Sequence, residues 1–80
     1  MSHLSTIIRR VKHKLEVYKG STEIFSDPIF IQAIRNLEEY QQYWKDFTPD
    51  EKRKADELLR IYNLPHLTDQ QKVEMLKKVV

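Results

Sequence analysis

The sequence predicts an all-α fold, a single compact domain of four short helices. Apolar residues recur at three- and four-residue steps along most of the chain, and helix start and stop signals divide them into four segments. No segment alternates apolar and polar residues between turn residues in the way that a strand does. The 80 residues, 40% of them hydrophobic, can form one core but not two, so we expect one domain over residues 1–80.

The first helix is expected at about residues 5–19. Its apolar residues fall on one arc of about 100°, and its basic residues are spread over the remaining surface. Gly20, the only glycine of the chain, follows the last of these apolar residues. Glycine readily adopts the left-handed backbone conformation that commonly ends a helix, so Gly20 is predicted to end this one. The apolar stripe consists of Leu4, Ile7, Ile8, Val11, Leu15 and Tyr18.

The second helix is expected at about residues 28–46, where Asp27 can cap the first turn and Pro28 fits the first helical position. Its apolar residues cover an arc of about 180°, which is wide for a surface helix. We therefore expect part of this face to stay uncovered, and we expect Tyr62 to lie near its aromatic end. Ile31 lies outside the arc and is expected to be exposed. The arc consists of Ile29, Phe30, Ala33, Ile34, Leu37, Tyr40, Tyr43, Trp44 and Phe47.

Two further helices follow, and each begins with a capping signal. The third is expected at about residues 49–62, where Thr48 and Glu51 have the spacing of a capping box. The fourth is expected at about residues 69–79, and Thr68 opens it with a weaker form of the same signal.

Charge is distributed unevenly along the chain, although the formal net charge is only +2. Residues 1–20 contain five basic residues and one acidic residue, whereas residues 21–47 contain two basic and five acidic residues. The first helix is therefore basic and the second acidic. Such polarity can orient a partner, and it can equally be satisfied within the fold.

The residues that catalysis requires are missing or badly spaced. The chain has no cysteine, which excludes a thiol catalyst, a disulfide and a cysteine-based zinc site. No two of the histidines (His3, His13 and His66) are three or four residues apart, the spacing that places two metal ligands on one helix face. One glycine cannot form a phosphate-binding loop. We therefore expect no catalytic site, no metal site and no cofactor.

The sequence also bears on the location of the protein. No apolar run approaches the roughly 18 residues that a membrane-spanning helix needs. Arg9 and Arg10 interrupt the apolar stretch near the start, so a secretory signal is not expected. A cytoplasmic protein is the default expectation.

These observations favour a non-catalytic helical protein–protein interaction module, such as an adaptor, an inhibitor or a regulatory subunit. We expect it to act through the apolar face of the second helix, with basic residues of the first helix as a charged rim. The predicted partner-binding residues are Ile31, Tyr43, Trp44, Arg9, Arg10 and Lys14. Self-association through the same face, as a homodimer, is compatible with this prediction.

The alternative is a nucleic-acid-binding protein that uses the basic first helix. The turn between the third and fourth helices fits a helix-turn-helix motif. Asp69 at the start of the fourth helix would repel phosphates, however, and the basic first helix is distant in sequence. The sequence leaves both hypotheses open.

The C-terminal residues offer a further apolar surface, formed by Met75, Val79 and Val80. Docking of these residues on the core is the simpler expectation. Their capture by a partner is the alternative.

Overall fold

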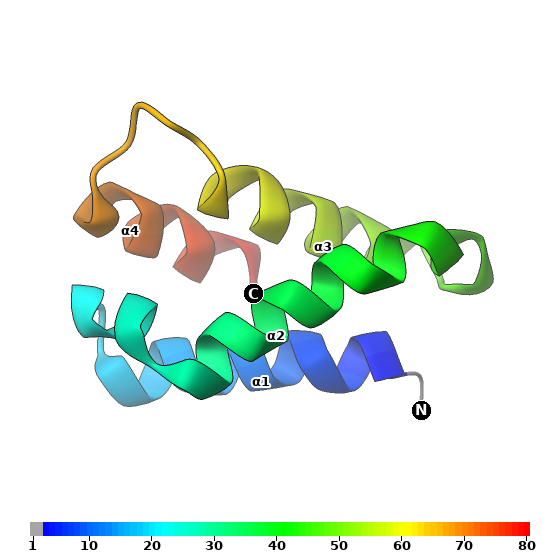
Figure 1. Cartoon of the computed structure of the whole chain (residues 1–80), viewed down its shortest axis with the longest axis horizontal. Coiled ribbons are helices and arrows are strands. Elements are labelled where there is room, and N and C mark those ends of the chain that lie inside the picture. The colour runs from blue at the N-terminus through cyan, green and yellow to red at the C-terminus, as the bar shows by residue number, and fades with distance from the viewer. Residues whose placement is uncertain (1–2) are drawn as a thin grey trace.

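Four α-helices and two short 3-10 helices form the described part of the structure, a computed structural model (Figure 1). It describes residues 3–80, and the side chains of residues 4–43 and 47–80. The predicted all-α fold, with four helices in one domain, is confirmed. The elements are α1 (His3–Tyr18), η1 (Thr22–Ser26), α2 (Pro28–Tyr40), η2 (Gln41–Asp46), α3 (Pro49–Tyr62) and α4 (Asp69–Val79).

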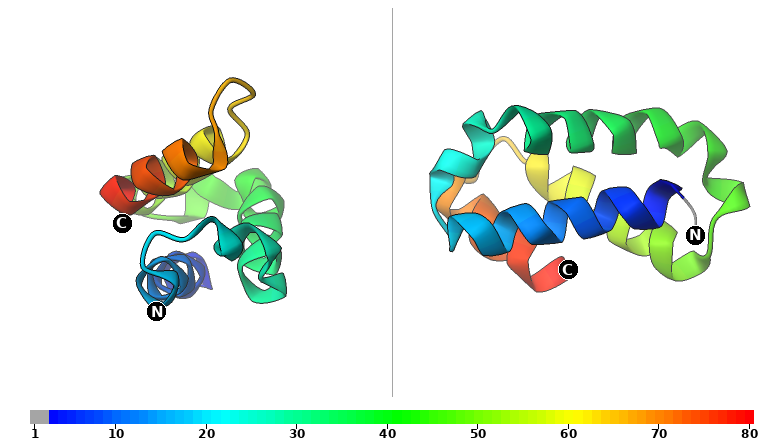
Figure 2. Two further views of the ribbon diagram at one scale, coloured as in Figure 1. Left: turned by 90° about the vertical axis from the view of Figure 1, so that its left-hand side faces the viewer. Right: turned by 90° about the horizontal axis from the view of Figure 1, so that it is seen from below.

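The α-helices form two antiparallel pairs, α1 with α2 and α3 with α4 (Figure 1). α2 lies on one side of the molecule, whereas α1 and the last turn of α4 lie on the other side (Figure 2). η1 connects α1 to α2 and also contacts α4. The end of the chain therefore lies beside the first helix, although the two are far apart in the sequence.

The core lies between the pairs and receives side chains from every α-helix. Phe30 of α2 is the largest fully buried side chain among the described residues. Ile24 of η1 is also fully buried, so this short helix covers part of the core. A chain of this size has much surface for its volume, so each helix must turn its apolar face inward. The other fully buried hydrophobic residues include Leu4, Val11, Ala33, Leu37, Ala55, Leu58, Val73 and Leu76.

The first two α-helices end in different ways. Gly20 has φ +83°, so it adopts the predicted left-handed conformation after α1. α2 is shorter than predicted, because its α-helical part ends at Tyr40 and the chain continues as η2. Tyr43 interrupts η2 with φ −117° and ψ 15°, where the chain turns toward α3 (Figure 1). The sequence does not reveal this ending because residues 41–46 contain neither glycine nor proline.

Threonine side chains cap the last two helices, as predicted. The Thr48 hydroxyl accepts a hydrogen bond from the amide of Glu51 at 3.2 Å. At α4, the Thr68 hydroxyl accepts from the amide of Gln71 at 3.2 Å, and the Thr68 amide donates to the Gln71 side chain at 2.9 Å. The box that the sequence predicted to be weaker is therefore complete.

Candidate partner-binding surfaces

The apolar residues predicted to bind a partner lie far apart along α2 and η2. Ile31 is half-buried near the start of α2 rather than fully exposed. Tyr43 lies in η2 with 55% of its surface exposed. Ile29, which was expected on the inner arc, is 50% exposed. The predicted contact at Trp44 falls outside the described side chains. The structure does not gather the described members of this set into one patch.

The predicted basic rim is divided between different sides of α1. Lys14 forms an ion pair with Asp27, with 3.0 Å between Nζ and Oδ2, and only 19% of its side chain is exposed. Arg10 is exposed on α1. Arg9 instead lines a small groove with Lys54 of α3. This ion pair joins α1 to the cap of α2, and the predicted partner contact at Lys14 stays a prediction.

Asp27 is the best connected carboxylate among the described residues. It is 8% exposed and accepts hydrogen bonds from the amides of Ile29 and Phe30, as the predicted cap of α2. Its pKa is held well below the usual range, chiefly because the Tyr18 hydroxyl donates to it at 2.6 Å. Lys14 and the two amides lower the pKa further, against the opposing effect of burial. Asp27 is therefore a structural group that joins α1 to α2.

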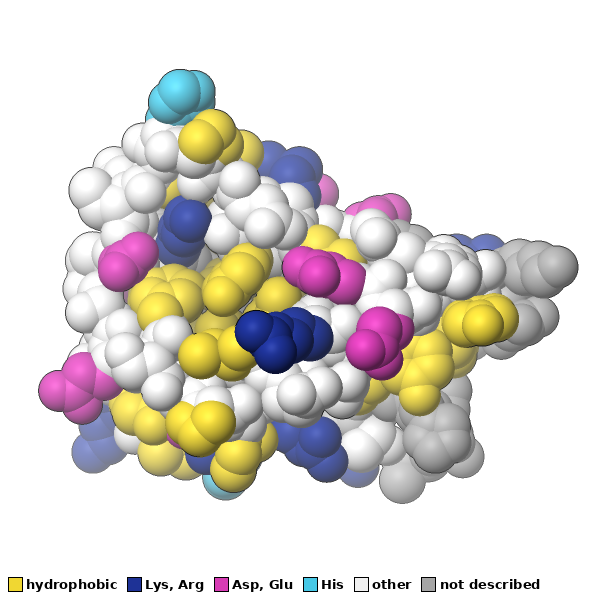
Figure 3. All heavy atoms as spheres, in the orientation of Figure 1, with side chains coloured by type: hydrophobic (Ala, Val, Ile, Leu, Met, Phe, Trp, Pro, Cys, Tyr) yellow, Lys and Arg dark blue, Asp and Glu magenta, His cyan; other side chains and the backbone are white. Residues whose placement is uncertain are grey.

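Five of the aromatic residues that the structure describes form two separate clusters. Tyr62 packs against Phe25 and Phe30 near the start of α2, with ring centroids 6.1 and 6.2 Å apart. Tyr40 packs against Phe47 at the other end, with centroids 6.0 Å apart. The prediction that Tyr62 lies beside the latter cluster was wrong, because α3 begins beyond η2 and runs back along the molecule. Figure 3 shows exposed hydrophobic side chains toward both ends of the face that is turned to the viewer.

The second surface surrounds the end of α4, where three grooves meet. One groove, of about 490 Å³, lies between α3 and α4. The other two, of about 200 and 210 Å³, lie between α1 and the end of the chain. Ten charged residues line them, and we call this set the basic face: Arg9, Lys12, Lys19, Arg53, Lys54, Arg60, Lys77, Lys78, Glu16 and Glu57.

The basic face has a larger positive charge than the chain as a whole. Its eight basic and two acidic residues give it a formal charge of +6. Because the whole chain has a charge of +2, the rest of it has a charge of −4. The fold therefore gathers cations of α1, α3 and α4 around these grooves, where Asp50, which pairs with Arg53 and Lys54, lowers the local formal charge to +5.

Some of these cations have carboxylate partners and others do not. Arg60 pairs with Glu57, and Asp50 pairs with both Arg53 and Lys54. No ion pair between described residues involves the four lysines near the end of α4, and three of them line one groove. These lysines are Lys12, Lys19, Lys77 and Lys78. Their charges are thus available to an external carboxylate or phosphate.

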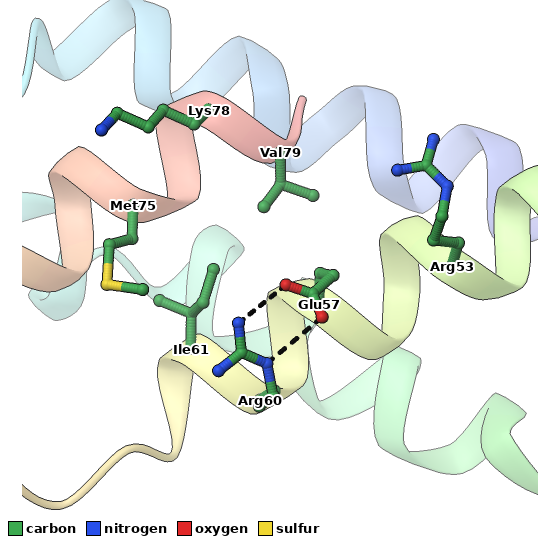
Figure 4. A pocket seen from close by; sticks show the side chains of 7 residues that line it. All are labelled: Arg53, Glu57, Arg60, Ile61, Met75, Lys78 and Val79. Atoms are coloured by element: carbon green, nitrogen blue, oxygen red, sulfur yellow. Dashed lines mark hydrogen bonds and ion pairs between the residues drawn. The ribbon is translucent and has the colours of Figure 1, made fainter.

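The groove between α3 and α4 combines charge with an apolar floor (Figure 4). Ile61, Met75 and Val79 point into its centre. Met75 and Val79 are half-buried and partly accessible. These two were predicted from the sequence as apolar surface, but neither Ile61 nor any basic residue was predicted beside them.

Neither the described side chains nor comparison with known proteins identifies another kind of site. Among the side chains of residues 4–43 and 47–80, no cluster of three or more histidines and carboxylates could hold a metal ion. None of the described helices is both long enough and apolar enough to cross a membrane. Comparison with protein-family models, with curated proteins and with solved structures finds no match.

Proposed function

We propose that the protein is a non-catalytic cytoplasmic binding module whose basic face contacts an acidic surface of a partner protein. The observation that supports this proposal is the concentration of positive charge on the basic face, +6 or, with the adjacent Asp50, +5, in a chain whose formal net charge is +2. Opposite charges on two partners steer their encounter and orient the complex. An adaptor or inhibitor that works by occupying a surface needs no catalytic group.

This proposal moves the contact surface from α2 to the end of α4. The predicted contacts Ile31 and Tyr43 stay a separate hypothesis, because exposed apolar residues occur singly on most protein surfaces. The basic face, in contrast, combines residues of α1, α3 and α4. A surface built from three helices is rigid, which lowers the entropy lost on binding.

Nucleic acid is the second candidate partner, and one observation favours it. Lys77 of α4 lines the same groove as Lys12 and Lys19 of α1, so the fold joins cations that are distant in the sequence. One feature favours a protein instead, because apolar side chains fill the space between the charges. Nucleic-acid interfaces are more polar and more uniformly positive.

Charge reversal at one position on the face tests the proposal. We expect Lys77→Glu to weaken binding of a labelled polyglutamate peptide about tenfold, measured by fluorescence anisotropy at moderate salt. Arg35→Glu is the matched control, because Arg35 is also an exposed helical cation but lies on α2, outside the basic face. The control should change affinity less than about twofold.

Two results would contradict the proposal. Equal losses in the two variants would mean that the probe responds only to net charge. Tighter binding of a random DNA duplex than of polyglutamate, with a steep fall as salt increases, would identify nucleic acid as the partner.

A further inference from the structure

The walls of the α3–α4 groove are formed by one face of each helix. Arg53, Glu57 and Arg60 follow one another at four- and three-residue steps on α3. Met75 and Val79 are four residues apart on α4. Residues at these spacings lie above one another along a helix, so both walls are continuous.

The dimensions of the groove match a short helical ligand. The lining residues of α3 run from Arg53 to Ile61, which corresponds to about 12 Å, or roughly two helical turns. The volume of about 490 Å³ lies in the range of well-formed binding sites. A helix that lies in such a groove inserts two or three apolar side chains from one face.

The charged residues along the groove indicate which polar groups a ligand must carry. Arg53 and Lys78 lie toward opposite ends of the groove with Arg60 between them, and Glu57 is the one carboxylate among the described residues that line it (Figure 4). Glu57 is engaged by the Arg60 guanidinium through two hydrogen bonds, at 2.8 and 3.2 Å (Figure 4). Arg53 pairs with Asp50, but both side chains are more than 60% exposed, so this pair is weak and a ligand carboxylate can replace Asp50.

From these observations we propose that the α3–α4 groove binds an amphipathic α-helix of the partner, with an apolar stripe on the groove floor and acidic residues at its sides. The inference rests on the proposed function, because it specifies the form of the acidic partner. Apolar residues of the ligand contact Met75 and Val79, which are half-buried above the buried Ile61, while its carboxylates reach Arg53 and Lys78. An extended acidic chain would satisfy the cations but would leave the floor uncovered.

A second copy of this chain is a less suitable occupant. α2 is acidic and has the exposed residue Ile29, but it lies on the opposite side of the molecule from the end of α4 (Figure 2). Contact between two different surfaces of identical chains closes only into a ring and otherwise produces open filaments. This geometry, rather than charge, favours a different protein as the occupant.

Two labelled peptides of identical composition test the inference. Both contain leucine, glutamate and alanine, but only one places its leucines on a single helical face. We expect the amphipathic peptide to bind at least about tenfold more tightly than the rearranged one, by fluorescence anisotropy. Amide shifts in NMR spectra of the unmodified protein should centre on Ile61, Met75 and Val79, and this measurement needs no variant.

A pair of matched variants locates the binding site. Met75→Glu places a negative charge on the groove floor and should weaken binding of the amphipathic peptide about tenfold or more. Ile29→Glu makes a comparable apolar-to-acidic change at an exposed position of α2 and should leave the affinity unchanged. If Met75→Glu does not fold, Met75→Ala, which removes only floor contacts, should still weaken binding by about threefold or more.

The outcomes separate this inference from the proposed function. If the protein binds both peptides with equal affinity, and Lys77→Glu weakens the binding of both, the groove inference is overturned and the basic face stays the binding surface. Failure of both peptides and of polyglutamate to bind would overturn both. Concentration-dependent assembly of the free protein that Met75→Glu abolishes would identify a second copy as the occupant and overturn the inference.

Discussion

The phenolic hydroxyl of Tyr18 donates a hydrogen bond to the carboxylate of Asp27 at 2.6 Å, and this bond joins the last residue of α1 to the cap of α2. Lys14 adds an ion pair to the same carboxylate from one turn earlier on α1. The loop between these helices is thus closed by polar contacts as well as by the buried side chain of Ile24. The stability of the fold should therefore respond to changes at this junction and in the turn that leads into it.

Replacing Asp27 with asparagine should destabilise the fold. The asparagine side chain could still cap α2, because an amide oxygen also accepts hydrogen bonds. It would lose the ion pair with Lys14 and the charge that strengthens the bond from Tyr18. We expect the melting temperature, followed by circular dichroism, to fall by about 5 °C or more. Asp56→Asn is the control, since Asp56 is exposed on α3, and a similar fall there would contradict this account.

The same junction should make stability depend on pH at both extremes. Folding lowers the pKa of Asp27, so its contribution is complete above the unfolded value of about 3.9 and is lost as pH falls toward the folded value. Folding raises the pKa of Tyr18, chiefly because its hydroxyl donates to Asp27. That contribution is complete below about pH 10 and is lost as pH rises through the folded value.

Denaturant unfolding at a series of pH values checks both limbs. Asp27→Asn should flatten the decline in the free energy of unfolding below about pH 4, and Tyr18→Phe should flatten the decline above about pH 10. Asp50 and Glu57 also have lowered pKa values, from exposed contacts with arginine, and account for a residual acid dependence. An acid limb unchanged by Asp27→Asn would show that Asp27 is not the main titrating group.

Gly20 should tolerate side chains poorly because of its backbone conformation. Its φ of +83° is unfavourable for residues that have a Cβ. Space is not the obstacle, since a Cβ would meet Lys77 Nζ at 3.6 Å and Glu74 Oε1 at 3.8 Å, which are ordinary contacts. We expect Gly20→Ala to lower the free energy of unfolding by about 1 kcal/mol, measured in denaturant. Gly20→Asn should cost less, because asparagine adopts this conformation more readily, and an equal cost would point to a steric clash.

The sequence predicted the features that depend on neighbouring residues. Asp27, Thr48 and Thr68 each cap the helix that follows, because a cap involves only the next three residues. Gly20 adopts the left-handed conformation two residues after the end of α1, directly after Lys19, which also has a positive φ. The end of α2 was placed incorrectly because residues 41–46 contain no glycine or proline that would mark the change from α-helix to 3-10 helix.

The candidate site depends on contacts that the sequence does not specify. Lys14 was predicted as a rim cation, but its partner Asp27 is brought to it only by the pairing of α1 with α2. Lys77 was read as part of the fourth helix alone, yet it lies beside Lys12 and Lys19 because α4 packs on α1. Periodicity shows which face of a helix is polar, but not which other helix supplies its neighbours.

Tyr43 allows the predicted α2 surface to be tested separately from the basic face. Because 55% of its surface is exposed, Tyr43→Ala should change the free energy of unfolding by less than about 0.5 kcal/mol. Phe30→Ala, at a fully buried position, should cost about 3–5 kcal/mol. If Tyr43 belongs to a contact between copies of the chain, the unmodified protein will show a larger mass at high concentration in light scattering, and Tyr43→Ala will reduce it. The small expected change in stability means that a lower mass of Tyr43→Ala could not be attributed to misfolding. A monomeric mass for both proteins would remove self-association through this residue and leave the end of α4 as the stronger candidate.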